Sequence, residues 1–268
     1  MTSTVDPTLP PLTPTYPPSK PSLDRETPQT RAIISHLNLQ PHVEGGYFVE
    51  TDRDPRRVPN PFSKLVFRSP SPFRSPPLTI NFPFPTAHSL TGKKSSTSAD
   101  SDILVSSRAA STTIHYYLTP ASPLGAFHRN RGRTVHTHHR GRARYVIIHA
   151  DEVAPSSRPG GYGSDNEEDT KEKKLWSGKA RVETFVVGPD VLAGERVQWI
   201  VEGGKYKASF LLEDEAGKGK ESGGCLISET VVPGFEFADH DFMKRGRAEA
   251  LLTQEQVEEM GWMLRREE

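Results

Sequence analysis

Runs of β-branched and aromatic residues, closed by Gly, Pro or Asp, recur through the central and C-terminal parts of the chain. Such runs are typical of strands. In one of them Tyr206, Ala208 and Phe210 alternate with Lys207 and Ser209, which is the period-2 pattern of a half-buried strand. Because no helical pattern separates the runs, we expect an all-β sandwich or barrel. The expected strands cover residues 111–118, 143–150, 180–188, 196–204, 205–212 and 224–232.

Helical signals lie near the two ends of the chain. Thr27 stands at an N-cap position and Pro28 at the first helical position, which predicts a short N-terminal helix. In the C-terminal segment 251–268, Thr253 and Gln256 have the spacing of a capping box, so we expect a C-terminal helix there.

Polar and proline-rich stretches interrupt these elements. The chain contains 24 prolines, and residues 1–26 are rich in Pro, Ser and Thr. Such a segment buries too little apolar surface to offset the entropy of ordering, so we expect it to be disordered. Residues 27–250 are expected to form a single domain with low-complexity insertions at 52–102, 155–174 and 213–224.

Overall composition excludes some classes of protein. The 34 Lys and Arg residues balance 34 Asp and Glu residues, so no overall basic field attracts nucleic acid. With one cysteine, Cys225, no intrachain disulfide is possible, which suits a reducing compartment. No signal-peptide pattern or membrane-length apolar run is present. We therefore expect a cytoplasmic protein without membrane association, and a nuclear location stays open.

Several motifs occur together in an order that resembles one family. They are PHVEGGYF (41–48), PLGAFHRNRGRTVHTHHRG (123–141) and ETVVPGFEF (229–237). These stretches are similar to the Cupin_5 (DUF985) family of the RmlC-like cupin superfamily, and the similarity covers residues 28–51 and 111–244. The resemblance implies a double-stranded β-helix, that is, a cupin or jelly-roll barrel. It also implies a homodimer, with small-molecule chemistry inside the barrel.

The histidine-rich stretch raises the question of a metal. His136 and His138 lie two residues apart, so a strand would point both rings to one face, and imidazole suits several transition metals. The resemblance to cupins implies a Glu and a further His in this site, but Thr134 and Lys207 occupy those places. We therefore expect no metal. A divalent metal held by His128, His136 and His138 is the alternative left open.

Cationic side chains favour a different ligand. Arg129 follows the Phe-His pair of the family motif, and guanidinium groups bind carboxylates and phosphates in a bidentate manner. A lysine near the pocket adds to this preference. We expect an anionic or polyhydroxylated small metabolite in the barrel. The candidate ligand-binding residues are Tyr47, His115, Arg129, Thr134, His136, His138 and Lys207.

Acid–base chemistry is the expected activity if the protein turns over a ligand. His128 is the candidate proton carrier, with Glu44 or Tyr117 as its catalytic partner, and Glu44 could instead form an ion pair with Arg129. Similarity to sugar epimerases of the cupin fold implies an isomerase or epimerase. The alternatives are a non-catalytic ligand-binding cupin, or a metal-dependent cupin enzyme that uses the His-rich strand. Nucleic-acid binding by residues 127–141 ranks third.

Overall fold

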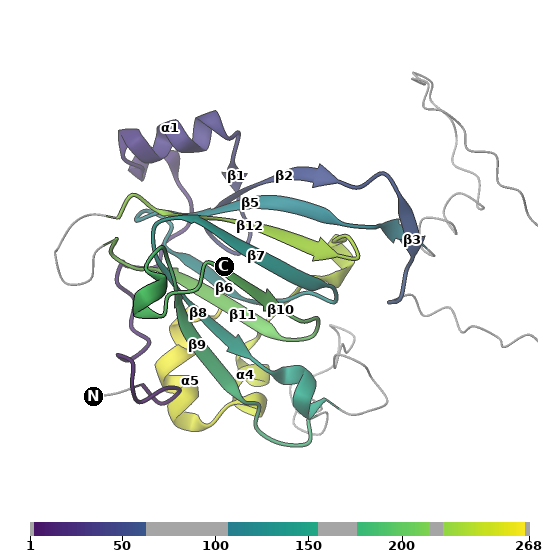
Figure 1. Ribbon diagram of the computed structural model, residues 1–268. Helices are drawn as coiled ribbons and strands as arrows, with labels where there is room; N and C mark the ends of the chain where they lie inside the picture. Colours follow the sequence, from purple (N-terminus) through teal and green to yellow (C-terminus); the bar gives the residue numbers. More distant parts are fainter. Residues whose placement is uncertain (1–2, 63–106, 155–175, 215–221, 266–268) are drawn as a thin grey trace, which may run out of the picture.

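Two antiparallel sheets face each other and form the body of the molecule (Figure 1). The computed structural model describes residues 3–62, 107–154, 176–214 and 222–265. The six-stranded sheet runs in the order β1-β2-β5-β12-β7-β10, and the five-stranded sheet in the order β13-β6-β11-β8-β9. Helices are few and short, so the expected all-β barrel architecture is confirmed.

The six strand runs expected from the sequence all appear, most with slightly narrower bounds. The strands of the six-stranded sheet are β1 (Gln40–Pro41), β2 (Tyr47–Arg53), β5 (Thr112–Leu118), β12 (Cys225–Val232), β7 (Arg133–Arg140) and β10 (Gln198–Val201). Those of the five-stranded sheet are β13 (Asp241–Phe242), β6 (Leu124–Arg129), β11 (Tyr206–Leu211), β8 (Ala143–Ile148) and β9 (Val182–Val187). A separate ribbon is made of β3 (Arg57–Pro59) and β4 (Ser107–Ala109).

A core between the two sheets defines the inside of the barrel. Both sheets contribute alternate residues to one buried cluster, because successive side chains of a strand point to opposite faces. The cluster contains Tyr116, Leu118, Trp199, Val201, Cys225 and Ile227 from the six-stranded sheet, and Ala143, Tyr145, Ile147, Phe185, Val187 and Leu211 from the five-stranded sheet. Side chains two positions away from a cluster member along the same strand therefore also face inward, and the side chains between them face outward.

Helices near the C-terminus cover the outer face of the five-stranded sheet (Figure 1). Tyr206, Ala208 and Phe210 pack beneath them, while Lys207 and Ser209 point between the sheets and are also buried. The sequence predicted a half-buried strand for β11, and this prediction is wrong. Both faces of the sheet are covered, so the side chains on both faces of the strand are buried. The covering elements are α4 (Arg245–Leu251), α5 (Gln254–Met260) and the 3-10 turn η6 (Gly261–Met263).

The helix caps follow the local sequence signals. Helix α1 (Pro28–His36) begins after Thr27, whose side chain accepts a hydrogen bond from the amide of Thr30. Helix α5 begins after Thr253, which forms the expected capping box with Gln256. The sequence indicated a helix over 251–268, whereas the structure has two helices that meet around Leu252, and α4 was missed. Its sequence, RGRAEAL, carries too few apolar residues to show a helical stripe.

The N-terminal segment, for which we expected disorder, packs against the C-terminal helices. Leu12 is fully buried, and its amide donates to the carboxylate of Glu259 at 2.8 Å. The indole of Trp262 donates to the carbonyl of Leu12 at 2.8 Å, and Arg144 donates to the carbonyl of Pro10 at 3.0 Å. One buried apolar side chain, together with hydrogen-bonded backbone groups, orders a proline-rich segment that composition alone predicts to be disordered.

Most of the expected low-complexity insertions fall outside the described residues, namely 63–102, 155–174 and 215–221. The start of the first insertion differs from the expectation, because residues 52–53 still belong to β2 and β3 follows at Arg57. Across the described ranges, none of the helices has both the length and the apolar character that crossing a bilayer demands.

We expect Leu12→Ala to lower the free energy of unfolding by about 2–4 kcal/mol, because it empties a fully buried site. Chemical denaturation of the full chain measures this change. Leu23→Ala is the matched control, since Leu23 is 50% exposed and its loss should cost about 0.5 kcal/mol or less. Equal effects of the two substitutions would show that the segment is not anchored at Leu12.

Candidate functional site

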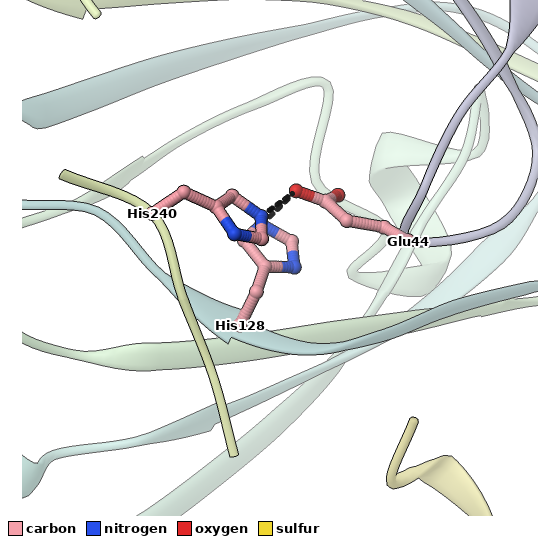
Figure 2. A group of neighbouring side chains, drawn as sticks. All are labelled: Glu44, His128 and His240. Atoms are coloured by element: carbon pink, nitrogen blue, oxygen red, sulfur yellow. Dashed lines mark hydrogen bonds and ion pairs between the residues drawn. The ribbon is translucent and has the colours of Figure 1, made fainter. Parts of the chain in front are cut away.

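Three side chains from distant parts of the chain meet beside the barrel interior, and we call them the Glu44 cluster: Glu44, His128 and His240 (Figure 2). His240 Nε2 lies 2.7 Å from Glu44 Oε1, and His128 Nε2 lies 3.3 Å from the same oxygen. One ligand atom from each residue lies within 4.8 Å of the other two. A fourth residue, His42, places Nδ1 3.5 Å from Glu44 Oε2.

The Gly-Gly pair of the PHVEGGYF motif (41–48) lets Glu44 approach strand β6. Gly45 has a φ of 104°, a backbone conformation that favours glycine, and a Cβ there would lie 2.0 Å from the carbonyl oxygen of Leu124. The amide of Ala126 donates to the carbonyl of Glu44 at 2.8 Å. This close contact sets the Glu44 carboxylate beside His128, two residues further along β6.

Buried ion pairs hold both neighbours of His240. Asp239 accepts hydrogen bonds from Arg108, and both side chains are only 4% exposed. On the other side, Asp241 accepts a hydrogen bond from Arg129 Nε at 2.8 Å. A buried carboxylate is costly without its cation, so these pairs fix the backbone that presents His240 to Glu44.

Arg129 therefore has a different place from the one we expected. It lies on the outer face of the five-stranded sheet, with its guanidinium 4.8 Å from the ring centre of Tyr206, and it pairs with Asp241 instead of Glu44. The reason is strand alternation: His128 points into the barrel, so its neighbour must point out. The expected pocket arginine is a buried structural cation.

A second polar group lies inside the barrel, and we call it the Lys207 cluster: Lys207, Glu229 and His136. The Lys207 ammonium contacts Glu229 Oε2 at 2.5 Å and His136 Nε2 at 2.9 Å, and all three side chains are 10% exposed or less. Lys207 stands directly opposite His128 in the pairing of β11 with β6. The two clusters thus share one interior.

Electrostatics fix the protonation of Glu44 and His128. Burial favours a raised pKa for Glu44, but the neighbouring His128 and His42 and the hydrogen bond from His240 hold that pKa well below its usual range. Burial lowers the pKa of His128 to about 3, against the opposing effect of Glu44. At neutral pH the carboxylate is therefore ionised and the His128 imidazole is neutral.

The proton of His128 sits on the nitrogen that faces away from Glu44. His128 Nδ1 lies 2.9 Å from the carbonyl of Ala126, and a carbonyl oxygen only accepts hydrogen bonds. Nε2 therefore presents a lone pair to the ionised carboxylate of Glu44 at 3.3 Å. Two electron-rich atoms that face each other in a buried site would be stabilised by a cation between them.

Three expected site residues lie on the outer face of the six-stranded sheet. Tyr47 and Tyr117 pack beneath α1 with Ile34 and Leu39, and the ring of His115 contacts His139. His115 and Tyr117 share the outward face of β5, and Tyr116 occupies the inward one. The structure thus separates Tyr117 from His128 and Glu44 and removes it from the expected catalytic set.

The remaining expected residues are on β7. His136 is buried inside the barrel, but its Nε2 bonds Lys207. His138 Nε2 donates to the carbonyl of Gly141 at 2.7 Å, and Thr134 is buried nearer the opposite end of the strand. Among the described residues, the group able to hold a metal is the Glu44 cluster, so the structure does not bring His128, His136 and His138 together as one.

Sequence reasoning missed three interior residues: His42, Glu229 and His240. His42 lies two positions before Glu44 in the PHVEGGYF motif, and His240 stands between two aspartates in ADHDF. An isolated histidine flanked by acidic residues near the end of the family motif was the available signal. No local pattern showed which element each of them would meet.

The jelly-roll barrel and its polar interior define a cupin. The chain matches the model of the Cupin superfamily (DUF985), Cupin_5, over residues 31–243, and it belongs to this family.

Two further proteins resemble this chain, one in sequence and one in fold. The uncharacterized protein YML079W of Saccharomyces cerevisiae is 32% identical over 212 residues, which are 79% of this chain and 74% of that protein. A solved structure, a hypothetical protein from Leishmania major, aligns with a TM-score of 0.53 and 21% identity, covering 87% of this chain and 97% of that one. Its likeness supports the fold alone.

A Bacillus subtilis oxalate decarboxylase also matches, with a TM-score of 0.28 and 14% identity, over 48% of this chain and 23% of that one. This likeness is too low to bear on function.

We expect Arg129→Met to lower the free energy of unfolding by about 1.5–3 kcal/mol, because the Asp241 carboxylate loses one charged donor and keeps Arg247 and Tyr206. Chemical denaturation at neutral pH measures the loss. Arg133→Met is the control: its ion pair with Glu202 is about half exposed and should contribute about 1 kcal/mol or less. A pocket arginine without a structural role would show no difference from this control.

The free energy of unfolding should also depend on pH through the ionisation of Glu229. Burial favours a raised pKa for Glu229, but Lys207 and His136 hold it below its ordinary value of 4.5. A depressed folded-state pKa contributes stability above the unfolded pKa, and this contribution is lost as the pH falls through the folded value. We expect the unfolding free energy of the wild type to fall below about pH 4.5, with a shallower slope in Glu229→Gln. Parallel slopes between pH 5 and 3 would contradict this assignment.

Proposed function

We propose that this protein is a metal-dependent cupin, in which Glu44, His128 and His240 hold a divalent transition-metal ion. The observation that carries the proposal is the His128 lone pair, which faces the ionised Glu44 carboxylate. Metal ligands must be deprotonated, and the pKa values of Glu44 and His128 are both lowered, that of Glu44 by its histidine neighbours and that of His128 by burial.

The donor set fits such an ion. Two imidazoles and one carboxylate suit iron, zinc or manganese. The separations of 2.7 and 3.3 Å from Glu44 Oε1 to the two imidazole nitrogens are close to the range of about 2.8–3.6 Å between neighbouring ligands that each lie about 2.0–2.2 Å from one ion. The hydrogen bond from His128 Nδ1 to the carbonyl of Ala126 is the support that fixes the tautomer of a metal-binding histidine.

Three protein ligands would leave coordination positions for a small molecule. A bound ion would act as a Lewis acid on a coordinated oxygen. The buried side chains of Tyr116, Tyr145 and Trp199 line the interior. Lys207 provides a buried cation next to His128. These walls support the anionic or polyhydroxylated metabolite expected from the sequence, although Arg129 does not take part.

Isomerisation or epimerisation by proton transfer is the second candidate. It is supported by Glu44 and His128, an acidic and a basic group within 3.3 Å. Both groups have pKa values shifted away from neutrality, which weakens them as proton carriers and ranks this function below metal binding. Exchange of substrate hydrogen with deuterated water that persists after metal chelation would favour it.

Nucleic-acid binding has less support. Arg129 pairs with Asp241, and Arg142, just beyond the 127–141 stretch, pairs with Glu195. These cations are engaged within the fold and do not form an open basic strip of the kind that follows a phosphate backbone.

We expect protein purified without a histidine tag, loaded with Zn²⁺ or Fe²⁺ and desalted, to retain about one ion per chain. Glu44→Gln and His240→Ala should lose most of this metal, because each removes one of three ligands. Elemental analysis by mass spectrometry measures the ratio. The control is the double variant His138→Ala/His139→Ala, which removes two histidines outside the cluster. Metal loss in this control, or none retained by the wild type, would contradict the proposal.

A further inference from the structure

We infer that the metal-loaded site binds a small monocarboxylate, held between the ion and the ammonium of Lys207. This inference rests on the proposed metal site and goes further, because it names the charge class of the ligand and makes its binding conditional on the metal.

The charge balance of the interior is the first argument. Glu44 and Glu229 carry two negative charges, and Lys207 carries one positive charge. The metal-free interior thus has a net charge of about −1 and repels anions. A divalent ion changes this net charge to about +1. Buried net charge requires compensation, and one monoanion at an open coordination position provides it.

The position of Lys207 is the second argument. Lys207 and His128 are directly opposite on adjacent antiparallel strands, so their side chains leave the same face of the sheet about 5 Å apart. An ammonium group has three donors. Among the described residues, Glu229 and His136 accept two of them. The third donor can serve a ligand oxygen on the metal side.

An indole nitrogen supplies the third argument. Trp199 is 4% exposed, and its Nε1 is buried without an acceptor among the described atoms. Its ring stacks on His136 at 4.9 Å between ring centres, which places it beside the Lys207 cluster. Buried donors are seldom left unpaired in folded proteins, so a ligand oxygen is the acceptor that this interior lacks.

The test compares two probes of nearly equal shape: glycolate, a monocarboxylate, and glycolamide, its neutral amide. Co²⁺ is titrated into the metal-free protein, and its visible absorption reports occupancy and coordination. We expect saturating glycolate to tighten Co²⁺ binding by about 10-fold and to change the spectrum, whereas glycolamide does neither. By linkage, Co²⁺ must tighten glycolate binding by the same factor, which calorimetry checks.

Two variants assign the effect to the named groups. Lys207→Met/Glu229→Gln removes one positive and one negative charge, so its affinity for Co²⁺ should stay within about 3-fold of the wild type while the glycolate effect disappears. Trp199→Phe keeps the ring but removes the donor, and it should weaken the glycolate effect several-fold. If the double variant does not fold, the size of the glycolate effect in Trp199→Phe tests the inference.

The outcomes separate the two proposals. If Co²⁺ binds through Glu44 but glycolate and glycolamide act alike, the monocarboxylate inference is overturned and the metal site stands. A glycolate effect that persists unchanged in both variants also overturns it. If Co²⁺ does not bind, or binds equally well to Glu44→Gln, the proposed function itself fails.

Discussion

The ion pair between Arg129 and Asp241 joins the barrel wall to the segment that presents His240. Its consequences reach the interior because Arg129 follows His128 on strand β6. One pair of adjacent residues thus supplies an inward imidazole and an outward guanidinium that secures a second imidazole from the far end of the family motif. The cluster at Glu44 exists because both faces of this strand are used at once.

The interior of the barrel is unusual because it contains buried charged and polar side chains. Lys207, Glu229 and His136 are buried where a purely structural barrel would hold aliphatic side chains. Replacing such groups by apolar ones is often neutral or stabilising, so the stability of the barrel alone does not account for their presence. Short contacts from Lys207 to Glu229 and His136 lower the cost of burying these charges beside Glu44.

Sequence reasoning succeeded where the determining interactions are local. The helix starts at Thr27 and Thr253 depend on residues within three positions, and both are confirmed. Which face of each strand is inward depends on the whole sheet, and the sequence alone did not show that Tyr117, a candidate partner of His128, faces outward. The approach of His240 to Glu44 joins residues 196 positions apart, and no spacing rule anticipates such a contact. The family resemblance supplied the fold, because it draws on many positions together.

The contact of the N-terminal segment with helix α5 has a consequence for how the molecule is divided. Residues 3–26 and helices α4 and α5 all lie outside the family match at 31–243, yet Leu12 joins them to each other and to the barrel. The segment is in effect an intramolecular ligand, which its covalent tether holds at a high effective concentration. A chain shortened to the family boundaries would lose the segment together with both helices, and the apolar outer face of the five-stranded sheet, with Tyr206, Ala208 and Phe210, would be open to solvent and to other chains.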